Sequence, residues 1–349
     1  PFRCFTFCCL TFDGMKMMNR THNTNTKTFS RTRTGVMTAM TLSLAIAAGN
    51  AQALTLYTAG PGSLAKKLAA GYEKQTGVKV DVFQATTGKV MARLEAEQAN
   101  PRADVLISAS WDTATDLEQR GWLLEYQSPN AEQVPPQFKT PYYVAQGISA
   151  LGIVWNTKSG TTEPKDWGDL AKPEFKDKVT TPDPSLSGAS LDLLIGLQNA
   201  HAQQAWKLFE DLKANGMIIA GPNAQALTPV LQGAKAAVFG AVDYVSYGSV
   251  QDGESVKVIF PSSGTVIAPR PMMILKSSQQ QKEARAFIDY ALSPDGQKLV
   301  ADAWLMPART DIDAKRPLFK SLKLLPEASQ ASASRKDVLD RFAKLFGQQ

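Results

Sequence analysis

The chain has 349 residues, 44% of them hydrophobic and 20% charged, and a formal net charge of +6. Six basic residues and one acidic residue precede Leu54, so the rest carries 32 basic and 31 acidic residues (38 less 6, and 32 less 1). The positive charge therefore belongs to the N-terminal segment, which removes the main support for nucleic-acid binding. All three cysteines also precede Leu54, which excludes disulfides and thiol chemistry in the remainder.

Residues 1–53 have the pattern of an upstream extension followed by a secretory signal peptide. Basic Lys27, Arg31 and Arg33 precede a small, apolar run that ends in Ala51-Gln52-Ala53. This order predicts export, with cleavage after Ala53. The run is too short and too rich in small residues for a comfortable membrane span. We expect the mature chain of 296 residues (349 less 53) to lie in the periplasm.

After Leu54, short strand patterns alternate with helix patterns, which predicts βαβ units and a largely parallel sheet in an α/β fold. Two long β-type segments, near 143–153 and 262–274, are suited to crossing between domains and to acting as a hinge. One helix is expected from about Ser190 to Lys213. The other expected strands lie at 54–59, 78–84, 103–110, 178–184, 217–221 and 236–244.

Enzymatic motifs are weak along this part of the chain. Gly60 and Gly62 fit the glycine turn of a dinucleotide-binding fold, with Asp81 about twenty residues further on, so an NAD-dependent enzyme is a remote alternative. However, Asp81 lies inside a strand pattern and not at its end. His201 is the one histidine after Leu54, and no metal ligand or acid–base partner stands at helical spacing from it. We therefore expect a protein that binds and does not catalyse.

Six strand-to-helix junctions carry small or hydroxyl side chains. In open α/β sheets such junctions lie at the carboxyl ends of strands, where ligands bind, and each helix start offers free N–H groups. For any one junction, an N-cap that serves only its own helix is the alternative. Together they predict a cleft for a small polar solute, lined by Ser63, Thr86, Thr87, Gly88, Ser110, Ser187, Gly188, Ala189, Ser190, Asn223, Asp243 and Tyr244.

Arg270 is a candidate counter-charge for an anionic solute. It stands between Pro269 and Pro271. Proline lacks an N–H group and is typical of strand edges and irregular segments, so this context favours a solvated arginine. The sequence leaves both interpretations open: a counter-charge for the solute, or a solvated surface arginine.

Several motifs resemble those of periplasmic solute-binding proteins of ABC importers, of the ferric-ion-binding type. That family also includes binders of phosphonates and phosphorylated solutes. The motifs are LTLYTAG from Leu54, TTGKVMARLEAE from Thr86, SGAS from Ser187, N-x₈-QGAKAAVFG from Asn223 and FIDY-x-LSPDGQ from Phe287.

The resemblance implies a two-lobed, type II periplasmic-binding fold with two extended hinge crossings. One lobe would comprise residues 54–145 and about 263–310, and the other residues 146–262, with a C-terminal helical segment, 311–349, packing on them. It also implies a monomer without a cofactor that delivers its solute to a permease.

The resemblance further divides the site into a metal half and an anion half. Iron-binding members use a histidine, a glutamate and two adjacent tyrosines, where this chain has Pro61, Ala109, Asp243 and Tyr244. Tyr247 is a possible substitute, so Tyr244 and Tyr247 would be the ligands of a ferric ion. A hard trivalent cation needs several anionic oxygens. The residues matched to the anion half are kept, as Ser187, Gly188, Ala189 and Asn223. We therefore favour a phosphonate or phosphate ester over iron.

Overall fold

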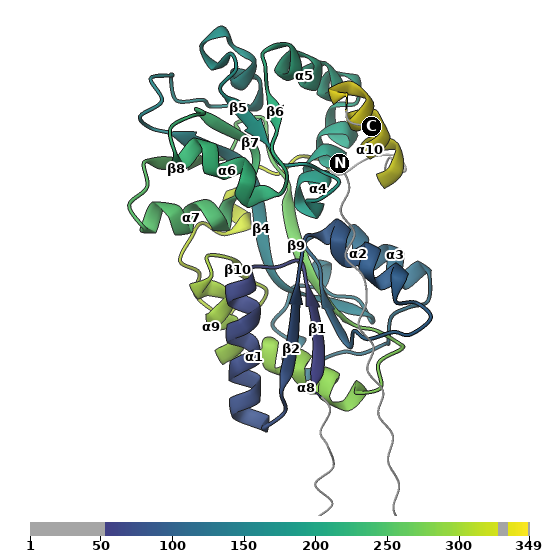
Figure 1. Ribbon diagram of the computed structural model, residues 1–349. Coiled ribbons are helices and arrows are strands. Elements are labelled where there is room, and N and C mark those ends of the chain that lie inside the picture. The colour runs from purple at the N-terminus through teal and green to yellow at the C-terminus, as the bar shows by residue number, and fades with distance from the viewer. Residues whose placement is uncertain (1–52, 327–333, 348–349) are drawn as a thin grey trace, which may run out of the picture. The chain divides into compact units, whose positions relative to one another are not determined.

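The computed structural model describes residues 53–326 and 334–347. The predicted extension and signal peptide therefore lie, up to residue 52, outside the described residues. The elements form two α/β lobes that are joined by long strands (Figure 1).

The strands form a mixed sheet in the order β2-β1-β3-β9-β4-β7-β5-β6, and β8 and β10 also pair with β4. Their bounds are β1 (Leu54–Thr58), β2 (Val80–Gln84), β3 (Val105–Ile107), β4 (Tyr143–Asn156), β5 (Val179–Thr181), β6 (Ile218–Ile219), β7 (Ala237–Val242), β8 (Val256–Ile259), β9 (Ile267–Ile274) and β10 (Met306–Pro307).

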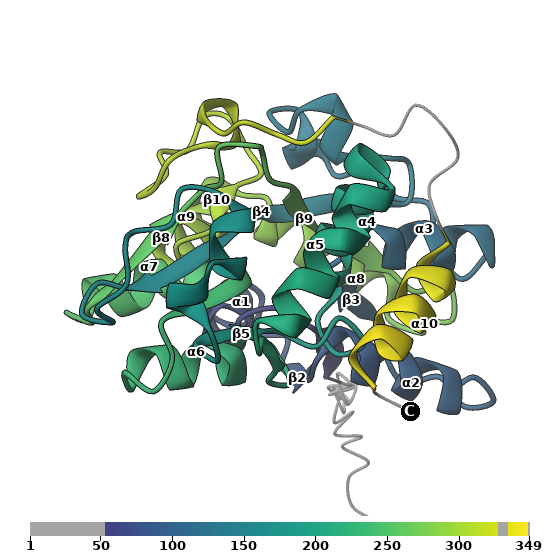
Figure 2. The same ribbon diagram turned by 90° about the horizontal axis from the view of Figure 1, so that it is seen from above.

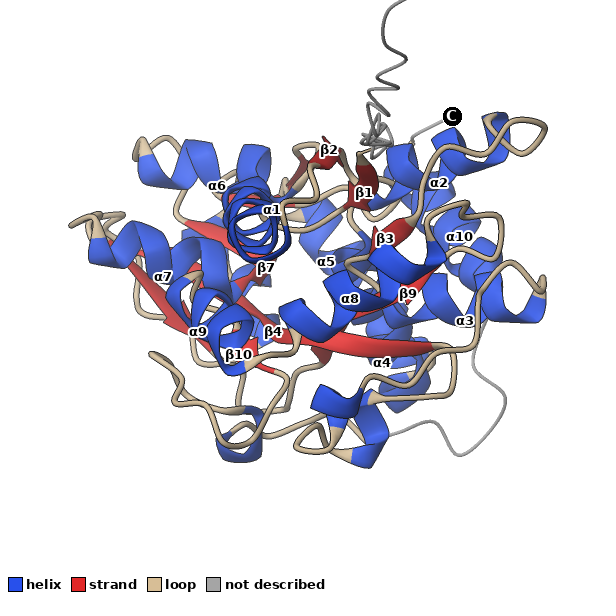
Figure 3. Cartoon of the chain, turned by 90° about the horizontal axis from the view of Figure 1, so that it is seen from below, coloured by secondary structure: helices blue, strands red, loops and turns tan. Residues whose placement is uncertain are grey.

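Helices cover the strands of both lobes (Figure 3). The α-helices are α1 (Gly62–Thr76), α2 (Thr87–Ala96), α3 (Trp111–Gln119), α4 (Gly188–His201), α5 (Gln203–Ala214), α6 (Asn223–Leu231), α7 (Asp243–Gln251), α8 (Gln281–Ala291), α9 (Pro294–Asp302) and α10 (Arg335–Phe346). Short 3₁₀ helices are η1 (Pro129–Ala131), η2 (Pro136–Phe138), η3 (Trp167–Ala171), η4 (Pro173–Phe175) and η5 (Phe319–Ser321).

Each lobe has its own parallel strands and its own hydrophobic core. In the first lobe β1 pairs with β2 and β3, and its core includes Leu56, Leu68 and Phe287. In the second lobe β5 pairs with β6 and β7, and its core includes Phe209 and Phe239. The parallel α/β arrangement predicted from the alternating patterns is thus confirmed.

Strand β4 crosses from one lobe to the other. Its first half pairs with β9, and its second half, from Leu151, pairs with β7 and β8. All 14 residues of β4 are buried, which explains why its sequence is mostly apolar and does not alternate; Gln146, Ser149 and Asn156 are its buried polar residues. Strand β9 is the second crossing, whereas β8, just before it, stays in the second lobe. The two predicted extended crossings are therefore present.

The helix predicted from Ser190 to Lys213 is instead two helices. Ala202 adopts φ +45° and ψ −113°, outside the helical region, so α4 ends and α5 begins around it. Trp206 of α5 donates from Nε1 to Gln198 Oε1 of α4 at 2.9 Å. The break lets both helices present apolar residues to the second-lobe core, which a single straight helix of this length could not do.

The SPDGQ motif has a structural role at the start of α9. Ser293 caps the helix by accepting the Gly296 N–H at 3.1 Å, and Pro294 occupies its first turn. Gln297 is fully buried, donates to the carbonyls of Gln146 and Ala291, and accepts the Ala308 N–H. The motif thereby joins α8, α9 and β4.

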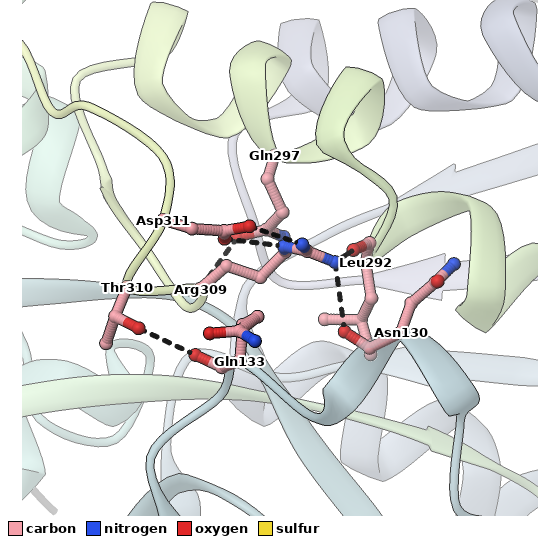
Figure 4. Close-up of polar contacts among 7 residues, drawn as sticks. All are labelled: Asn130, Gln133, Leu292, Gln297, Arg309, Thr310 and Asp311. Carbon is pink, nitrogen blue, oxygen red and sulfur yellow. Dashed lines mark hydrogen bonds and ion pairs between the residues drawn. The ribbon is translucent and has the colours of Figure 1, made fainter.

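Arg309 anchors the chain that follows β10 (Figure 4). Its Nε and Nη2 bind the two carboxylate oxygens of Asp311 at 2.8 and 2.6 Å, and Nη1 reaches the carbonyls of Asn130 and Leu292. The C-terminal segment is therefore held to the first lobe before it leaves. Further on, α10 packs against α4 of the second lobe through Val338 and Phe342 (Figure 2). In the part of the chain that the structure describes, no helix is both long and apolar enough to cross a membrane.

Candidate functional site

Two predicted helix starts are N-capped by their own hydroxyl residues. Thr86 accepts the Lys89 N–H at the start of α2, at 3.4 Å, and Ser187 accepts the Ser190 N–H at the start of α4, at 3.2 Å. Asn223, at the start of α6, donates to the Ser187 Oγ at 2.8 Å. Thr86 and Ser187 therefore cap their own helices, but capping leaves the remaining N–H groups of each first turn available.

The starts of α2 and α4 come from different lobes and touch. A Cβ atom at Gly88 would lie 2.5 Å from the carbonyl oxygen of Ser185, and one at Gly188 would lie 2.8 Å from the Ser110 Cβ and 3.0 Å from the Thr87 Oγ1. The distances of 2.5 and 2.8 Å are shorter than real Cβ contacts, so glycine is required at both positions for this approach. The lobes are in contact at the predicted site.

Replacing Gly88 by valine should keep the lobes apart and weaken solute binding, because the added methyl groups would collide with the backbone at Ser185. Small-angle scattering with and without solute measures the closure. Gly168→Ala is the matched control, since a Cβ atom there meets nothing within 4 Å. A Gly88→Val variant whose radius of gyration still decreases on adding solute would show that this contact does not limit closure.

Arg270 lies on β9 and is only 1% exposed, so the solvated position favoured by its proline neighbours is wrong. Its Nη2 donates to the Ala59 carbonyl at 2.8 Å, and its guanidinium carbon lies 5.8 Å from the centre of the Tyr244 ring. Its Nε has no hydrogen-bond partner among the described residues. Burial lowers the pKa of Arg270. A buried cation with an unused donor is a strong attractor for an anion.

The two prolines beside Arg270 fit a local irregularity of the sheet. The β4–β9 register shifts between Ala145 and Ile148, opposite Pro271 and Pro269. Such irregularities redirect a side chain, and prolines are tolerated there because a ladder N–H group is not required. The two prolines, which in the sequence favour an exposed position, therefore lie opposite an irregularity inside the sheet.

Within the part of the chain that the structure describes, buried polar atoms without a partner occur on both sides of the interlobe contact. Besides Arg270 Nε, they include Thr87 Oγ1 of the first lobe and Asn223 Oδ1 of the second. Buried polar atoms are nearly always satisfied in folded proteins, so unpaired ones in neighbouring elements indicate a site for a polar partner.

Other predicted site residues are placed differently. Ser63 is exposed in the first turn of α1, and Ser190 uses its hydroxyl to bond the Pro182 carbonyl at 3.2 Å. Ala189 is buried in the second-lobe core. Asp81 lies at the amino end of β2, paired with Thr55, whereas the glycine turn follows the carboxyl end of β1. The dinucleotide motif is therefore split between opposite edges of the sheet.

Asp243 is fully buried in an ion pair with Arg316. Its Oδ2 lies 2.5 Å from Arg316 Nη2 and accepts the Ala150 N–H at 2.8 Å. Burial raises the pKa of Asp243, and the charge of Arg316 opposes that shift. Because this carboxylate is engaged by the C-terminal segment, the structure does not present it as an open ligand.

The two tyrosines of α7 have different surroundings. Tyr244 is partly buried, contacts both lobe cores and lies beside Arg270. Tyr247 stacks on Trp304, with ring centres 6.1 Å apart, and Arg316 lies 5.0 Å from its ring. Burial raises the pKa of Tyr247. The structure thus places Tyr244 next to Arg270 and Tyr247 between Trp304 and Arg316.

Asp192 of α4 is not among the predicted residues, yet it joins the lobes. Ser110, the N-cap residue of α3, does not cap its own helix and donates its hydroxyl to Asp192 Oδ1 at 2.6 Å. Burial raises the pKa of Asp192 to about 7. The signal was present in the sequence, since Asp192 stands four residues after Gly188 and so on the same helix face.

This architecture, with two α/β lobes, two crossing strands and opposed helix starts, is the type II fold of periplasmic binding proteins. Residues 100–325 match the model of a family described as bacterial extracellular solute-binding protein, and the chain belongs to that family.

Similar proteins have different ligands in their names. A Salmonella typhimurium periplasmic protein, provisionally named as 2-aminoethylphosphonate-binding, is 24% identical over 74% of this chain and 78% of its own. The structure of the periplasmic binding protein AfuA of Actinobacillus pleuropneumoniae, bound to fructose-6-phosphate, has a TM-score of 0.77 and 23% identity over 85% and 99% of the two chains. Iron-bound HitA of Pseudomonas aeruginosa has a TM-score of 0.71 and 21% identity over 84% and 98%.

Proposed function

We propose that this protein is the periplasmic solute-binding component of an ABC importer, and that its solute is a small phosphonate or phosphate ester. The protein would hold the solute between its lobes and deliver it to the permease subunits, as a monomer and without catalysis or a cofactor. The buried, incompletely bonded Arg270 at the interlobe contact is the observation that carries this proposal.

The donor chemistry supports an oxyanion. Arg270, the Thr87 hydroxyl and the first-turn N–H groups of α2 and α4 are all hydrogen-bond donors, and helix N-termini favour negative charge. A ferric ion instead needs anionic oxygens. Asp243 is engaged by Arg316, and Tyr247 lies against Trp304, so Tyr244 alone would supply a phenolate.

Native mass spectrometry of protein purified without refolding, with phosphorus and iron analysis, tests the ligand class. We expect a bound phosphorus compound. Ser187→Ala should weaken binding about tenfold and Tyr244→Phe somewhat less, because hydrogen bonds to charged groups contribute about 1.5–3 kcal/mol and neutral ones about 0.5–1.5. Stoichiometric iron, a colour from phenolate-to-iron charge transfer and complete loss of binding in Tyr244→Phe would establish iron as the ligand and refute the proposal.

A further inference from the structure

The lobes meet on both sides of the crossing strands, and the two contacts differ in chemistry. On one side the starts of α2 and α4 touch, and on the other side α7 of the second lobe faces α9 of the first (Figure 1). On this second side Tyr247 of α7 stacks on Trp304, the second residue after α9, with ring planes 26° apart. The chemistry of each contact decides how easily the lobes part there.

Trp304 occupies a backbone position that favours glycine. Its φ is +61°, in the left-handed region, and glycine is the usual residue there just after a helix. A bulky residue in this conformation costs free energy and persists only where its surroundings hold it. The end of α9 therefore does not require a tryptophan, and the ring of Trp304 instead covers Tyr247 of the other lobe.

Residues 309–322 form a strap that is tied to the first lobe near both ends. Thr310 donates its N–H to the Gln133 carbonyl at 3.0 Å. The Phe319 ring lies 5.3 Å from the ring of Phe138, and both belong to the first-lobe core or pack against it. The strap therefore belongs to the first lobe.

The middle of the strap reaches across to the second lobe. Arg316 forms the buried ion pair with Asp243 at the start of α7, and its guanidinium lies over the Tyr247 ring. The preceding residue, Lys315, pairs with Asp302 of α9 at 2.6 Å. Because both side chains of the Arg316–Asp243 pair are 0% exposed, water does not reach this pair. The strap thus holds α7 and α9 together.

The contact between α2 and α4 consists of small and polar groups. Gly88 and Gly188 approach the other lobe closely. Ser110 donates to Asp192 at 2.6 Å, and Arg335 of α10 donates to Ser110 at 3.4 Å. When the lobes part, water can replace these hydrogen bonds and bond the helix N–H groups. Parting α7 from α9 would instead expose two stacked rings and separate a buried ion pair, which costs more free energy.

We propose that the contact between α7 and α9 is a fixed pivot. The lobes part between α2 and α4, where the solute enters, and stay joined at Tyr247 and Trp304. This inference rests on the proposed function, since it assumes that the solute is held between the lobes. It adds the direction of opening, which a hinge made of two crossing strands leaves undefined.

Distances between paired spin labels, measured by pulsed EPR, test the pivot. The three native cysteines, all before Leu54, are replaced by serine. The labels are attached at exposed helix positions, as a pivot pair (Val250→Cys of α7 with Lys298→Cys of α9) and an entry pair (Ala96→Cys of α2 with Ala224→Cys of α6). Without solute we expect a broad distance distribution for the entry pair and a narrow one for the pivot pair. Saturating ethylphosphonate should shorten and narrow only the entry-pair distribution.

Trp304→Gly should loosen the pivot without unfolding the protein, because it removes the ring and suits the left-handed backbone. The pivot-pair distribution should become broader in this variant, and the melting temperature shows whether the variant is folded. Trp122→Ala is the matched control, since it removes a first-lobe tryptophan that lies under Arg120. The pivot-pair distribution should stay narrow in the control.

Two results would overturn the inference. One is a pivot pair in the native protein whose distance is as broad as that of the entry pair, or changes as much on adding ethylphosphonate. The other is a folded Trp304→Gly variant whose pivot-pair distribution stays as narrow as the native one. If ethylphosphonate does not bind, the proposed ligand class fails, and the distributions measured without solute still decide whether the pivot exists.

Discussion

Replacing Arg270 by methionine should reduce oxyanion binding at least about 100-fold while the protein stays folded, since two or more hydrogen bonds to a charged group are lost at once. The expected stability change has the opposite sign from that of most core substitutions. Arg270 is 1% exposed, donates to Ala59 and has no partner for its Nε among the described residues. Methionine fills similar space without a buried charge, so the melting temperature should not fall.

Calorimetry with ethylphosphonate and thermal melting without solute measure the two effects of Arg270→Met. Arg285→Met is the control, because Arg285 is exposed and lies over the Tyr126 ring on the first lobe. An unchanged dissociation constant in Arg270→Met would remove Arg270 from the site. A large drop in melting temperature, with binding lost in parallel, would show that Arg270 is needed for folding and not for recognition.

Replacing Arg316 by methionine should destabilise the protein by about 3–5 kcal/mol, because it leaves a buried, unpaired carboxylate. Asp243 and Arg316 are both 0% exposed at their side chains. The carboxylate also accepts the Ala150 N–H in the middle of β4, so the pair connects the C-terminal segment, α7 and the crossing strand. The double variant Asp243→Asn, Arg316→Met removes both charges, keeps an acceptor for Ala150 and should recover most of the loss.

Urea unfolding measures these free energies. Lys257→Met is the control, since Lys257 and Glu163 form an exposed ion pair at 2.6 Å, whose loss should cost under about 1 kcal/mol. An equal loss of unfolding free energy in Arg316→Met and Lys257→Met would mean that the buried ion pair stabilises the protein no more than the exposed one. Failure of the double variant to recover would place the effect of Arg316 in its packing on Tyr247 and not in its charge.

The local sequence patterns of apolar and turn residues were sufficient to predict the class of fold. The parallel strands, the helix that follows each of them and the buried β4 crossing all follow from apolar periodicity and from turn residues, which act over a few positions of the chain. The motif resemblance was sufficient for the family, as the match of residues 100–325 confirms. The break at Ala202 was not predicted, because residues 198–204 contain no glycine or proline that would mark the end of a helix.

Only the tertiary structure decided which side chains at the interlobe contact are buried and which charges are paired. Pro-Arg-Pro is typical of an exposed segment, yet Arg270 is buried on β9, an internal strand that pairs with β3 on one side and β4 on the other. Asp243 stands at a helix start like the other predicted residues, but Arg316, 73 positions away (316 less 243), neutralises it. Asp192 and Ser110 meet across 82 positions. Burial and charge pairing depend on which distant segments approach in space, and that information is absent from any short stretch of sequence.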